Sequence, residues 1–519
     1  MEEALGPYAA PPGYDEAVGP DGVRPAYRQT FDFFGRMAPR EFGRRRALTD
    51  LAFRNQGITF TVYDDDEGTE RAFPFDPVPR IITGDEWAHV DAGLRQRVTA
   101  LNAFLGDVYG DQEIMGDGVV PANLVLDNPN YRPMMRGVVP PLGTWTHIVG
   151  TDLIRDHDGT FRVLEDNLRN PSGVSYMLVN RDVTARSFPG LLRTHGVRPI
   201  RHYTIDLLAT LCSLSPRDVD DPTVVLLTPG QFNSAYYEHS YLAQQMGVDL
   251  VEGRDLFVDE GRLWMGTTHG RQVVDVVYRR IDDAFLDPDV FRPDSMLGVP
   301  GLMEVVRAGR VGLANAVGTG VADDKAIYAY VPAMIDYYLG EEAILPNVET
   351  YLGADPDGLD LMMGESERLV IKEVGGAGGY GMLIGSQADD RERAAFLELV
   401  AADPSNYIAQ PIIQLSSHPT FYPDTHALEP CHVDLRPFAL VGEDIRIVPG
   451  GLTRVALERG SLVVNSSRGG GSKDTWVLAQ DDQAEVDDLV DDSRTRRPRD
   501  HHREAATEVR AEGDQEADQ

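Results

Sequence analysis

Two carboxylates and an amide are spaced so that they could hold a divalent metal ion. Asp152 lies near the end of a predicted strand at 147–154, and the polar residues 156–160 predict a tight turn after it. Glu165 and Asn167 follow on the returning strand, two positions apart, so their side chains share one face. Oxygen donors of this kind suit Mg²⁺, which also takes waters and phosphate oxygens. The same pattern is typical of a solvated polar strand edge, so both interpretations stay open for this segment alone.

A glycine-rich segment lies between two short predicted strands, 369–372 and 382–384. Its glycines are Gly375, Gly376, Gly378, Gly379 and Gly381. In a P-loop or a dinucleotide fingerprint the glycines precede a helix, whereas here they join two strands. Such a hairpin lets backbone N–H groups approach phosphates closely, and Lys372 would add a cation beside them. The alternative is a flexible turn that binds nothing.

Two further segments could complete a nucleotide site. Residues 407–413 predict a strand that leads into a bend, where Gln410 and Ile412 could face an adenine ring. Lys325 follows a pair of aspartates that predicts a helix start, so it could bring a second cation to the phosphates. An ordinary exposed lysine at the start of a helix has the same sequence pattern.

Three arginines could meet a phosphate or a developing negative charge. Arg436 lies on a predicted strand at 429–438, Arg454 lies on the next predicted strand, and Arg169 stands in the polar loop after Asn167. Arginine is a common clamp for phosphate because its planar guanidinium binds two oxygens at once. Each of the three could equally be a structural ion-pair partner.

These candidate residues need a scaffold of strands and helices. The spacing of apolar residues predicts a helix over 87–105, and a helical pattern at 29–51 should break at Pro39. Residues 223–251 have the pattern of a βαβ unit, with a helix-like stretch between two short apolar runs. This unit predicts an α/β fold with a mostly parallel sheet.

Composition limits the classes of function. The 519-residue chain has a formal net charge of −35, which would repel nucleic acid and anionic membranes. It contains no apolar stretch of about 20 residues and no secretory pattern at its start, so we expect a cytoplasmic protein. Its two cysteines, Cys212 and Cys431, form no metal-ligand cluster and suit a reducing compartment.

Taken together, the segments resemble the circularly permuted type 2 ATP-grasp family from about residue 10 to about residue 478. The segments that carry the resemblance are 163–173, 291–295, 318–325, 372–381, 432–438 and 465–476. In ordinary ATP-grasp enzymes the glycine-rich loop precedes the Glu-x-Asn metal motif. Here Glu165 and Asn167 come before the loop, which fits a permutation. The resemblance implies an α/β ATP-grasp fold with its subdomains in permuted order.

The resemblance also suggests how the chain is divided. The expected parts are an N-terminal arm with a strand and helix segment (1–80), a metal-binding part (81–200), an α/β part (201–320), a nucleotide-binding part (321–480) and a disordered charged tail (481–519), with the middle three forming one catalytic module (81–480). The tail is expected because its charged runs contain few large apolar residues.

The activity implied by the resemblance is that of an ATP-dependent carboxylate–amine ligase with an acyl-phosphate intermediate. Its cofactors would be ATP and Mg²⁺, with the metal on Asp152, Glu165 and Asn167 and the nucleotide on the two lysines and the glycine loop. An ATP-dependent phosphotransferase and a non-catalytic ATP-binding partner protein remain as alternatives.

The resemblance leaves one departure and one set of partners to consider. The glutathionylspermidine synthetase group has an arginine two residues before the first acid of its metal pattern, whereas this chain has Gly150. Arg169, Arg436 or Arg454 would then have to take the catalytic role of that arginine. Family members are linked to alpha-E-domain and transglutaminase-like proteins, which we expect as partners beside small-molecule or peptide substrates.

Overall fold

The computed structural model describes most of the chain. The described residues are 8–55, 57–62, 69–193, 195–376, 381–459, 461, 464 and 470–480, with only the backbone of 59–62 and 69–72. Gly378 and Gly379 of the predicted phosphate loop, part of the 465–476 segment and the predicted tail at 481–519 lie outside this set. Residues up to Leu478 belong to one compact unit.

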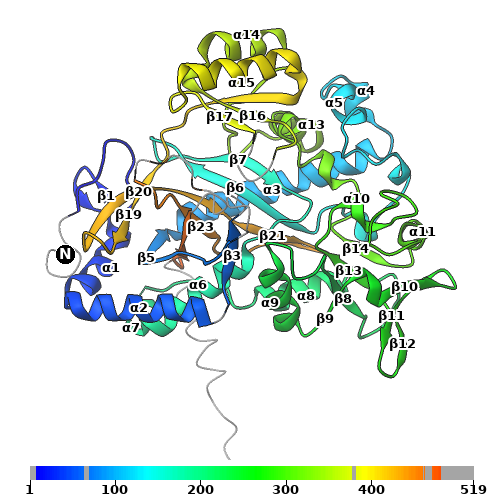
Figure 1. The fold of residues 1–519 in the computed structure, drawn as a ribbon, viewed down its shortest axis with the longest axis horizontal. Helices are drawn as coiled ribbons and strands as arrows, with labels where there is room; N and C mark the ends of the chain where they lie inside the picture. The colour runs from blue at the N-terminus through cyan, green and yellow to red at the C-terminus, as the bar shows by residue number, and fades with distance from the viewer. Residues whose placement is uncertain are drawn as a thin grey trace, which may run out of the picture. The chain divides into compact units, whose positions relative to one another are not determined.

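The largest sheet in the described part of the chain has nine strands and carries the candidate metal ligands (Figure 1). Its strands are β5 (Phe75–Ile82), β6 (Ile148–Arg155), β7 (Phe161–Asn167), β19 (Ser417–Tyr422), β20 (Ala427–Arg436), β21 (Phe438–Val441), β22 (Ile445–Ile447), β23 (Leu452–Val455) and β24 (Gly471–Val477). The order is β22-β21-β6-β20-β23-β24-β5, with β7 beside β6 and β19 beside β20. Only β24 and β5 run parallel among these described pairs, so the mostly parallel arrangement does not extend to this sheet. The predicted boundary at residue 80 falls inside β5.

The predicted βαβ unit is present and forms part of a parallel sheet. In the described chain this sheet has the order β14-β13-β8-β9. Its strands are β8 (Val224–Leu227), β9 (Asp249–Val251), β13 (Val276–Arg279) and β14 (Gly312–Ala314). Strand β8 is buried along its whole length, as expected for a parallel sheet covered on both faces. An antiparallel sheet of β10 (Leu256–Asp259), β11 (Arg262–Thr267) and β12 (Gly270–Val273) follows β9 in the chain.

A smaller antiparallel sheet carries the glycine-rich segment. Its strands are β15 (Tyr351–Leu352), β16 (Leu369–Glu373), β17 (Met382–Ile384) and β18 (Tyr407–Pro411), in the order β15-β18-β16-β17. The glycines join antiparallel neighbours β16 and β17, so the predicted hairpin is confirmed. Two helices, α14 (Pro356–Glu365) and α15 (Asp390–Ala402), lie against this small sheet at the top of Figure 1.

The remaining elements follow local sequence signals. The other helices are α1 (Pro25–Gly35), α2 (Pro39–Asn55), α3 (Gly84–Val108), α4 (Glu113–Gly116), α5 (Ala122–Leu126), α6 (Val174–Ser187), α7 (Pro189–Leu192), α8 (Tyr203–Cys212), α9 (Tyr236–Met246), α10 (Asp283–Leu286), α11 (Leu302–Arg307), α12 (Lys325–Tyr328) and α13 (Val331–Leu339), and the short hairpins are β1 (Val18–Gly19) with β2 (Gly22–Val23) and β3 (Thr59–Val62) with β4 (Thr69–Ala72). The predicted break at Pro39 separates α1 from α2. Helix α3 begins at a capping box between Thr83 and Glu86.

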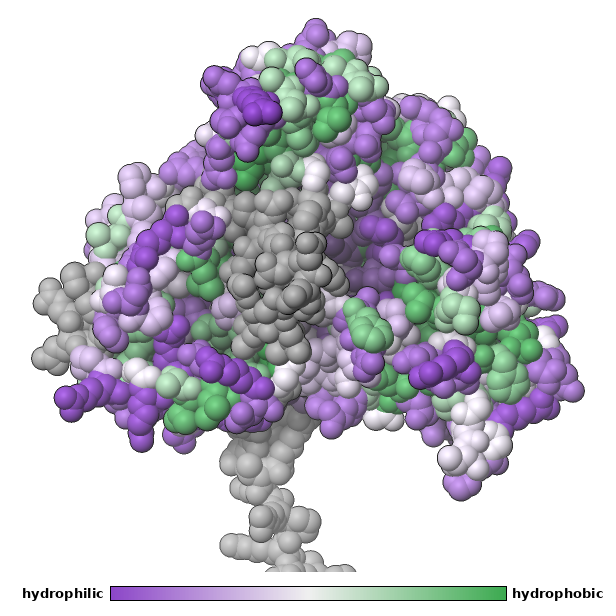
Figure 2. Space-filling model, in the orientation of Figure 1, coloured by the Kyte–Doolittle hydropathy of each residue, from purple (hydrophilic) through white to green (hydrophobic). Residues whose placement is uncertain are grey.

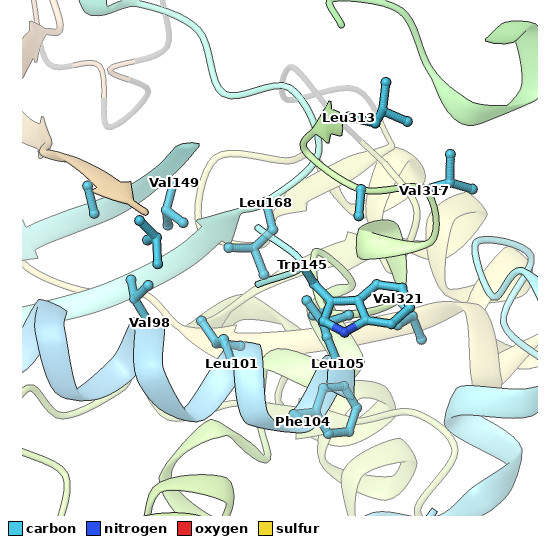
Figure 3. Packing of buried hydrophobic residues seen from close by; sticks show 14 of the residues in the cluster. Val98, Leu101, Phe104, Leu105, Trp145, Val149, Leu168, Leu313, Val317 and Val321 are labelled. Atoms are coloured by element: carbon cyan, nitrogen blue, oxygen red, sulfur yellow. The ribbon is translucent and has the colours of Figure 1, made fainter. Parts of the chain in front are cut away.

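The main hydrophobic core lies directly behind the site strands. Figure 3 shows Val98, Leu101 and Leu105 of α3 packed toward Trp145, Val149 and Leu168. Val149 precedes Gly150 on β6 and Leu168 follows Asn167 on β7, so the core fixes both strands from behind. A packed core of this kind resists local rearrangement and gives the site a rigid floor.

Two smaller expectations can be compared with the structure. None of the described helices is long and apolar enough to cross a membrane. Cys212 and Cys431 are both free thiols, half-buried and buried respectively.

Candidate active site

One cleft of about 670 Å³ collects most of the predicted site residues. It is lined from the largest sheet, from the small sheet and α12, and from loops beside α6 and α9. Figure 2 shows a hollow in this face of the molecule, between the small sheet above and the parallel sheet below, with hydrophilic residues on its visible walls. A cleft of this size is within the range of small-molecule sites.

The predicted residues that line this cleft come from distant parts of the sequence. They are Asp152, Glu165, Asn167, Arg169, Lys325, Lys372, Gly375, Gly376, Gln410, Ile412, Arg436 and Arg454. Gly381 directly precedes β17 and is not among the lining residues. Gly378 and Gly379 lie outside the described residues.

The two candidate metal carboxylates face each other across a pair of strands. Asp152 on β6 is the cross-strand partner of Glu165 on β7, at a register shift that follows Asp152. Arg436 on β20 lies near both, because its Nη2 is 2.7 Å from Asp152 Oδ2 and 3.8 Å from Glu165 Oε1. These two distances together place the carboxylate oxygens within about 6.5 Å of each other. The pair is therefore close enough to share a small group of ligands.

The electrostatic surroundings push the two carboxyls in opposite directions. Burial alone would raise the pKa of Asp152, but the Arg436 and Arg454 guanidiniums outweigh it and hold that pKa well below its ordinary value. Removal from bulk water and the neighbouring Asp152 carboxylate raise the pKa of Glu165, only partly offset by Lys325 and Arg436. A further cation in the cleft would therefore stabilise the charged form of Glu165.

The donor chemistry of this corner fits Mg²⁺. Glu165 keeps 32% of its side chain exposed to the cleft, and Asn167 lines the cleft with its buried Nδ2 lacking a described hydrogen-bond partner. No cluster of three or more His, Cys, Asp or Glu side chains suited to a metal occurs among the described residues. Two carboxylates and an amide oxygen would therefore supply part of a ligand set, with phosphate oxygens and waters as the rest.

All three predicted arginines are held in ion pairs. Arg436 binds both oxygens of Asp152 through Nε and Nη2, and Arg454 Nη2 reaches Asp152 Oδ2 at 2.7 Å. Arg454 also binds Asp434, its cross-strand partner, at 2.9 Å through Nε. In the loop after β7, Arg169 Nε donates to Asp323 Oδ2 at 2.6 Å. Arg436 and Arg454 therefore lie beside the candidate metal carboxylate Asp152, whereas Arg169 lines a different part of the cleft with its own acid.

Gly150 leaves room for one of these arginines. A Cβ added at Gly150 would lie 3.3 Å from Arg436 Cδ and 3.0 Å from Pro171 Cβ. The aliphatic stem of Arg436 thus packs over the glycine, in the space where a side chain at position 150 would begin. Arg436 from β20 thus lies over the position at which the related group has an arginine and this chain has Gly150.

The two predicted lysines point into the same cleft from different elements. Asp324 caps α12 by accepting from the N–H groups of Ala326 and Ile327, which fixes Lys325 in the first turn. Lys325 Nζ donates to the Gly376 carbonyl, and Lys372 Nζ donates to Gln410 Oε1 at 2.7 Å. Burial, with Lys325 nearby, lowers the pKa of Lys372 to about 8 although Glu165 opposes this. Both described lysine partners are neutral oxygens, so neither charge is cancelled by direct contact with an acid.

An apolar slot lies beside Lys372 on the small sheet. Its lining residues are Val348, Val370, Met382, Ile384, Ile412 and Ile413. The Ile412 N–H donates to the Arg368 carbonyl at 3.0 Å, so this donor is already used within the protein. A flat apolar ring could lie in the slot with its polar edge toward Gln410 or the strand backbone.

Comparison with known proteins agrees with this geometry. The sequence model of the family described as circularly permuted ATP-grasp type 2 matches residues 79–456. The chain belongs to this family. Its fold also resembles a solved glutathione synthetase-like effector from Globodera pallida, with a TM-score of 0.56 and 11% identity over 85% of this chain and 98% of the other.

Relatives of the chain extend through most of its length. An uncharacterized protein of Synechocystis sp. is 54% identical over 90% of this chain and 97% of its own. An uncharacterized protein of Mycobacterium tuberculosis is 51% identical over 90% of this chain and 84% of its own. A Frankia casuarinae protein named "Putative glutamate--cysteine ligase 2-2" is 43% identical, but the match covers only 54% of that protein.

The sequence patterns of this ATP-grasp protein did not predict that Phe73, Leu452 and Val464 would line the cleft. Ser172, Gly173 and Tyr176, which also line it, belong to the polar segment after Asn167 that the sequence singles out. Behind it, Glu238 on α9 accepts from the N–H groups of Gly173 and Ser175 at 2.8 and 3.0 Å. Phe73, Leu452 and Val464 come from three separate segments and follow no motif, so only the fold brings them to the cleft.

Proposed function

We propose that this chain is an ATP-dependent carboxylate–amine ligase. The observation that carries the proposal is the pair of lysines, Lys325 and Lys372, with neutral described partners, opposite the Asp152–Glu165 pair in one cleft. Triphosphate oxygens need cations that are not already neutralised by carboxylates. Membership in the ATP-grasp family and the ligase name of the Frankia relative support the same activity.

The nucleotide would bind on the small sheet. The adenine would enter the slot beside Gln410 and Ile412, and the two lysines and the described glycines Gly375 and Gly376 would face the phosphates. Mg²⁺ on Glu165, Asn167 and Asp152 would neutralise phosphate charge when bound. In phosphoryl transfer such positioning and charge stabilisation account for most of the catalysis.

The proposed reaction has two steps, phosphorylation of a carboxylate and then formation of the amide. A substrate carboxylate oxygen attacks the γ-phosphorus, and the bond to the bridging oxygen breaks, giving an acyl phosphate and ADP. An amine nitrogen then attacks the acyl carbon, phosphate leaves, and the nitrogen loses a proton as the amide forms. Arg436 and Arg454, at the corner with Asp152, would stabilise the charge that develops on the transferring group.

Arg436 is the better candidate for the catalytic arginine. It reaches Asp152 and lies 3.8 Å from Glu165, and its stem fills the space over Gly150. Arg454 is bound on two sides by Asp152 and Asp434 and is 8% exposed, which leaves it less free to meet a substrate. Arg169 would act at the edge of the cleft, where Asp323 already holds it.

Product analysis tests the proposal. Purified protein is incubated with Mg-ATP and a panel of carboxylates and amines, and ADP, phosphate and amide are measured together. A ligase gives the three products in equal amounts, and the amount falls to background in the Lys372→Ala variant. A phosphorylated product without amide would instead indicate a phosphotransferase, and nucleotide binding without turnover would indicate a non-catalytic protein. Alpha-E-domain and transglutaminase-like proteins stay proposed partners, and adding them to the reaction tests their effect.

A further inference from the structure

The short segment 171–175 lies between the cleft and the start of α6. Ser172 and Gly173 line the cleft, and the Ser172 carbonyl accepts from Arg436 Nη1 at 3.2 Å. Helix α6 then begins at Val174, with Gly173 as its N-cap residue at φ +111. The free N–H groups of a first helical turn need acceptors, and a glycine has no side-chain oxygen to offer them. The acceptor must therefore come from another part of the fold.

Glu238 on α9 supplies that acceptor. Its Oε2 accepts from the Gly173 N–H at 2.8 Å, from the Ser175 N–H at 3.0 Å and from the Ser175 hydroxyl at 2.9 Å. The side chain of Glu238 is 0% exposed, so these hydrogen bonds are made away from solvent. One carboxylate oxygen thus fixes two residues that flank the start of the helix.

Arg280 holds the same segment from beside Glu238. It directly follows β13, and its Nη2 donates to Glu238 Oε1 at 3.0 Å while its Nη1 donates to the Pro171 carbonyl at 2.7 Å. Arg280 is buried as well. The two side chains form an ion pair, which we call the Glu238–Arg280 clamp. Together they make four hydrogen bonds to segment 171–175, one from Arg280 and three to Glu238.

Stability alone is a poor reason for a charged clamp at this place. Removing two charges from water costs free energy that their attraction only partly returns, so buried ion pairs add little net stability over neutral groups. What the clamp does provide is a fixed geometry, because segment 171–175 cannot shift without breaking several buried hydrogen bonds at once. That geometry is needed where the segment faces the cleft.

The Ser172 carbonyl orients the guanidinium of Arg436. Nε and Nη2 of Arg436 bind Asp152, and the described partner of the remaining nitrogen, Nη1, is the Ser172 carbonyl. The three contacts fix the plane of the guanidinium, whose Nη2 lies 3.8 Å from Glu165 Oε1. A shift of Ser172 would release one edge of this plane and let it tilt relative to the candidate metal carboxylates.

We propose that Glu238 and Arg280 are positioning residues for phosphoryl transfer. This inference rests on the proposed function, in which Arg436 stabilises the charge on the transferring group. The clamp holds segment 171–175, and the Ser172 carbonyl of that segment holds Arg436. Neither clamp residue is among those that line the described cleft, so both act through Arg436 and not by touching the substrate.

The kinetic test uses Glu238→Gln, which keeps the shape of the side chain. The new amide NH₂ has to face either the N–H groups of α6 or Arg280, so two donors meet where a hydrogen bond was. ADP release from Mg-ATP is measured with the same panel of carboxylates and amines. We expect kcat to fall at least about tenfold and the KM for Mg-ATP to change less than about twofold, since the nucleotide binds on the lysines.

The matched control is Asp275→Asn, at the other end of β13. Asp275 is also 0% exposed, and it accepts from Arg217 Nη2 at 2.7 Å and from the Thr223 N–H at 2.8 Å. It is thus another buried carboxylate that binds an arginine and a backbone N–H, but it has no contact with segment 171–175 in the described structure. Asp275→Asn should lower the melting temperature much as Glu238→Gln does and leave kcat unchanged, with both variants assayed below their melting transitions.

Hydrogen exchange shows whether the clamp holds the segment. The amides of Gly173 and Ser175 should exchange at least about tenfold faster in Glu238→Gln than in Asp275→Asn. If Glu238→Gln does not fold, Arg280→Lys takes its place. Lysine keeps a cation beside Glu238 but has one terminal nitrogen where arginine has two, so kcat should fall about threefold at an unchanged KM.

The outcomes separate this inference from the ligase proposal. If wild-type protein releases ADP and Glu238→Gln loses no more kcat than Asp275→Asn, the positioning role is wrong and the ligase proposal stands. Equal amide exchange in the two variants would overturn the role as well. If wild-type protein releases no ADP with any substrate pair, the proposed function fails and the positioning role falls with it.

Discussion

The two charged walls of the cleft hold their cations in different ways. On the wall formed by β6, β7, β20 and β23, Arg436 and Arg454 bind Asp152 and Asp434, so positive and negative groups are already matched. On the wall formed by β16, β18 and α12, Lys325 and Lys372 donate to a backbone carbonyl and to a glutamine oxygen. The arginine wall is thus a fixed framework, whereas the lysine wall keeps positive charge available. A nucleotide would need the lysine wall for binding its phosphates and the arginine wall for precise positioning.

The largest expected effect comes from Glu165, the carboxylate of the arginine wall that lacks a close ion pair. Its nearest described cation is Arg436 at 3.8 Å, so Glu165→Gln should leave the fold intact. Turnover of Mg-ATP should fall by about a thousandfold, because a charged metal ligand is lost. Steady-state ADP release with thermal melting measures both. Turnover within twofold of wild type would remove Glu165 from the metal site.

Removal of Arg436 should lower stability in addition to activity. The variant Arg436→Ala leaves the buried Asp152 with Arg454 alone, and breaking a buried pair of this kind costs about 3 kcal/mol. Denaturant unfolding gives the change in free energy of unfolding. The control is Arg446→Ala, whose pair with Asp206 lies on the surface and should be worth less than about 1 kcal/mol. Equal losses in the two variants would mean that the arginine wall is not a stabilised framework.

Removal of Lys372 should weaken nucleotide binding without lowering stability. Lys372→Ala should weaken Mg-ATP binding by about ten- to a hundredfold, since a phosphate cation is lost from a partly desolvated site. Stability should stay the same or rise slightly, because the charge of this half-buried lysine lowers stability below pH 8 and its described partner is neutral. Calorimetric titration with Mg-ATP beside a melting curve separates the two effects. An unchanged affinity would exclude the assigned role.

The pH dependence of nucleotide binding tests the charge on Lys372. Its pKa lies at about 8 in the free protein, below the ordinary 10.5, and bound phosphates would raise it again. Affinity should be level below about pH 8 and weaken by up to about tenfold per pH unit above it. Because the pKa of Lys372 is lower in the folded protein than in the unfolded chain, the unfolded chain holds this proton more tightly. The charge on Lys372 therefore lowers the free energy of unfolding below pH 8, and this destabilisation fades as the pH rises toward 10.5. Proton uptake on binding near pH 8.5, measured by calorimetry in two buffers, should vanish in Lys372→Arg.

The smallest effect concerns the described end of the glycine hairpin. Gly381 has φ +64, and an added Cβ would lie 2.6 Å from the Glu373 carboxyl group. Gly381→Ala should therefore cost about 1 kcal/mol of stability. Gly364→Ala on α14, where a Cβ meets open space, is the matched control and should be neutral or slightly stabilising. If both variants melt alike, the hairpin has no conformational need for glycine at 381.

Much of the scaffold follows from local sequence patterns. The β6–β7 and β16–β17 hairpins, the break at Pro39 and the β8–α9–β9 unit are all confirmed. Local patterns suffice here because alternation, turn residues and proline act over a few positions. The antiparallel character of the largest sheet could not be read in this way, because strands such as β6 and β20 are joined through distant parts of the chain.

The site was predicted as a set of residues but not as a set of interactions. Which acid binds Arg436 or Arg454 depends on the register between β6, β20 and β23, and sequence spacing does not contain it. Phe73 and Leu452, which also line the cleft, escaped prediction for a similar reason, since they come from two segments far apart in the chain. Residues beyond the described set, Gly378 and Gly379 among them, stay predictions.

The central claim is that a carboxylate is activated as an acyl phosphate in this cleft, and oxygen transfer tests it most directly. A substrate whose carboxylate is labelled with ¹⁸O is incubated with the protein, Mg-ATP and an amine, and the released phosphate is examined by ³¹P NMR. Our account predicts that one labelled oxygen per turnover passes from the carboxylate to phosphate, and that Glu165→Gln abolishes the transfer. Amide formation with unlabelled phosphate would contradict the account, because the carboxylate would then have been activated without bonding to the γ-phosphorus.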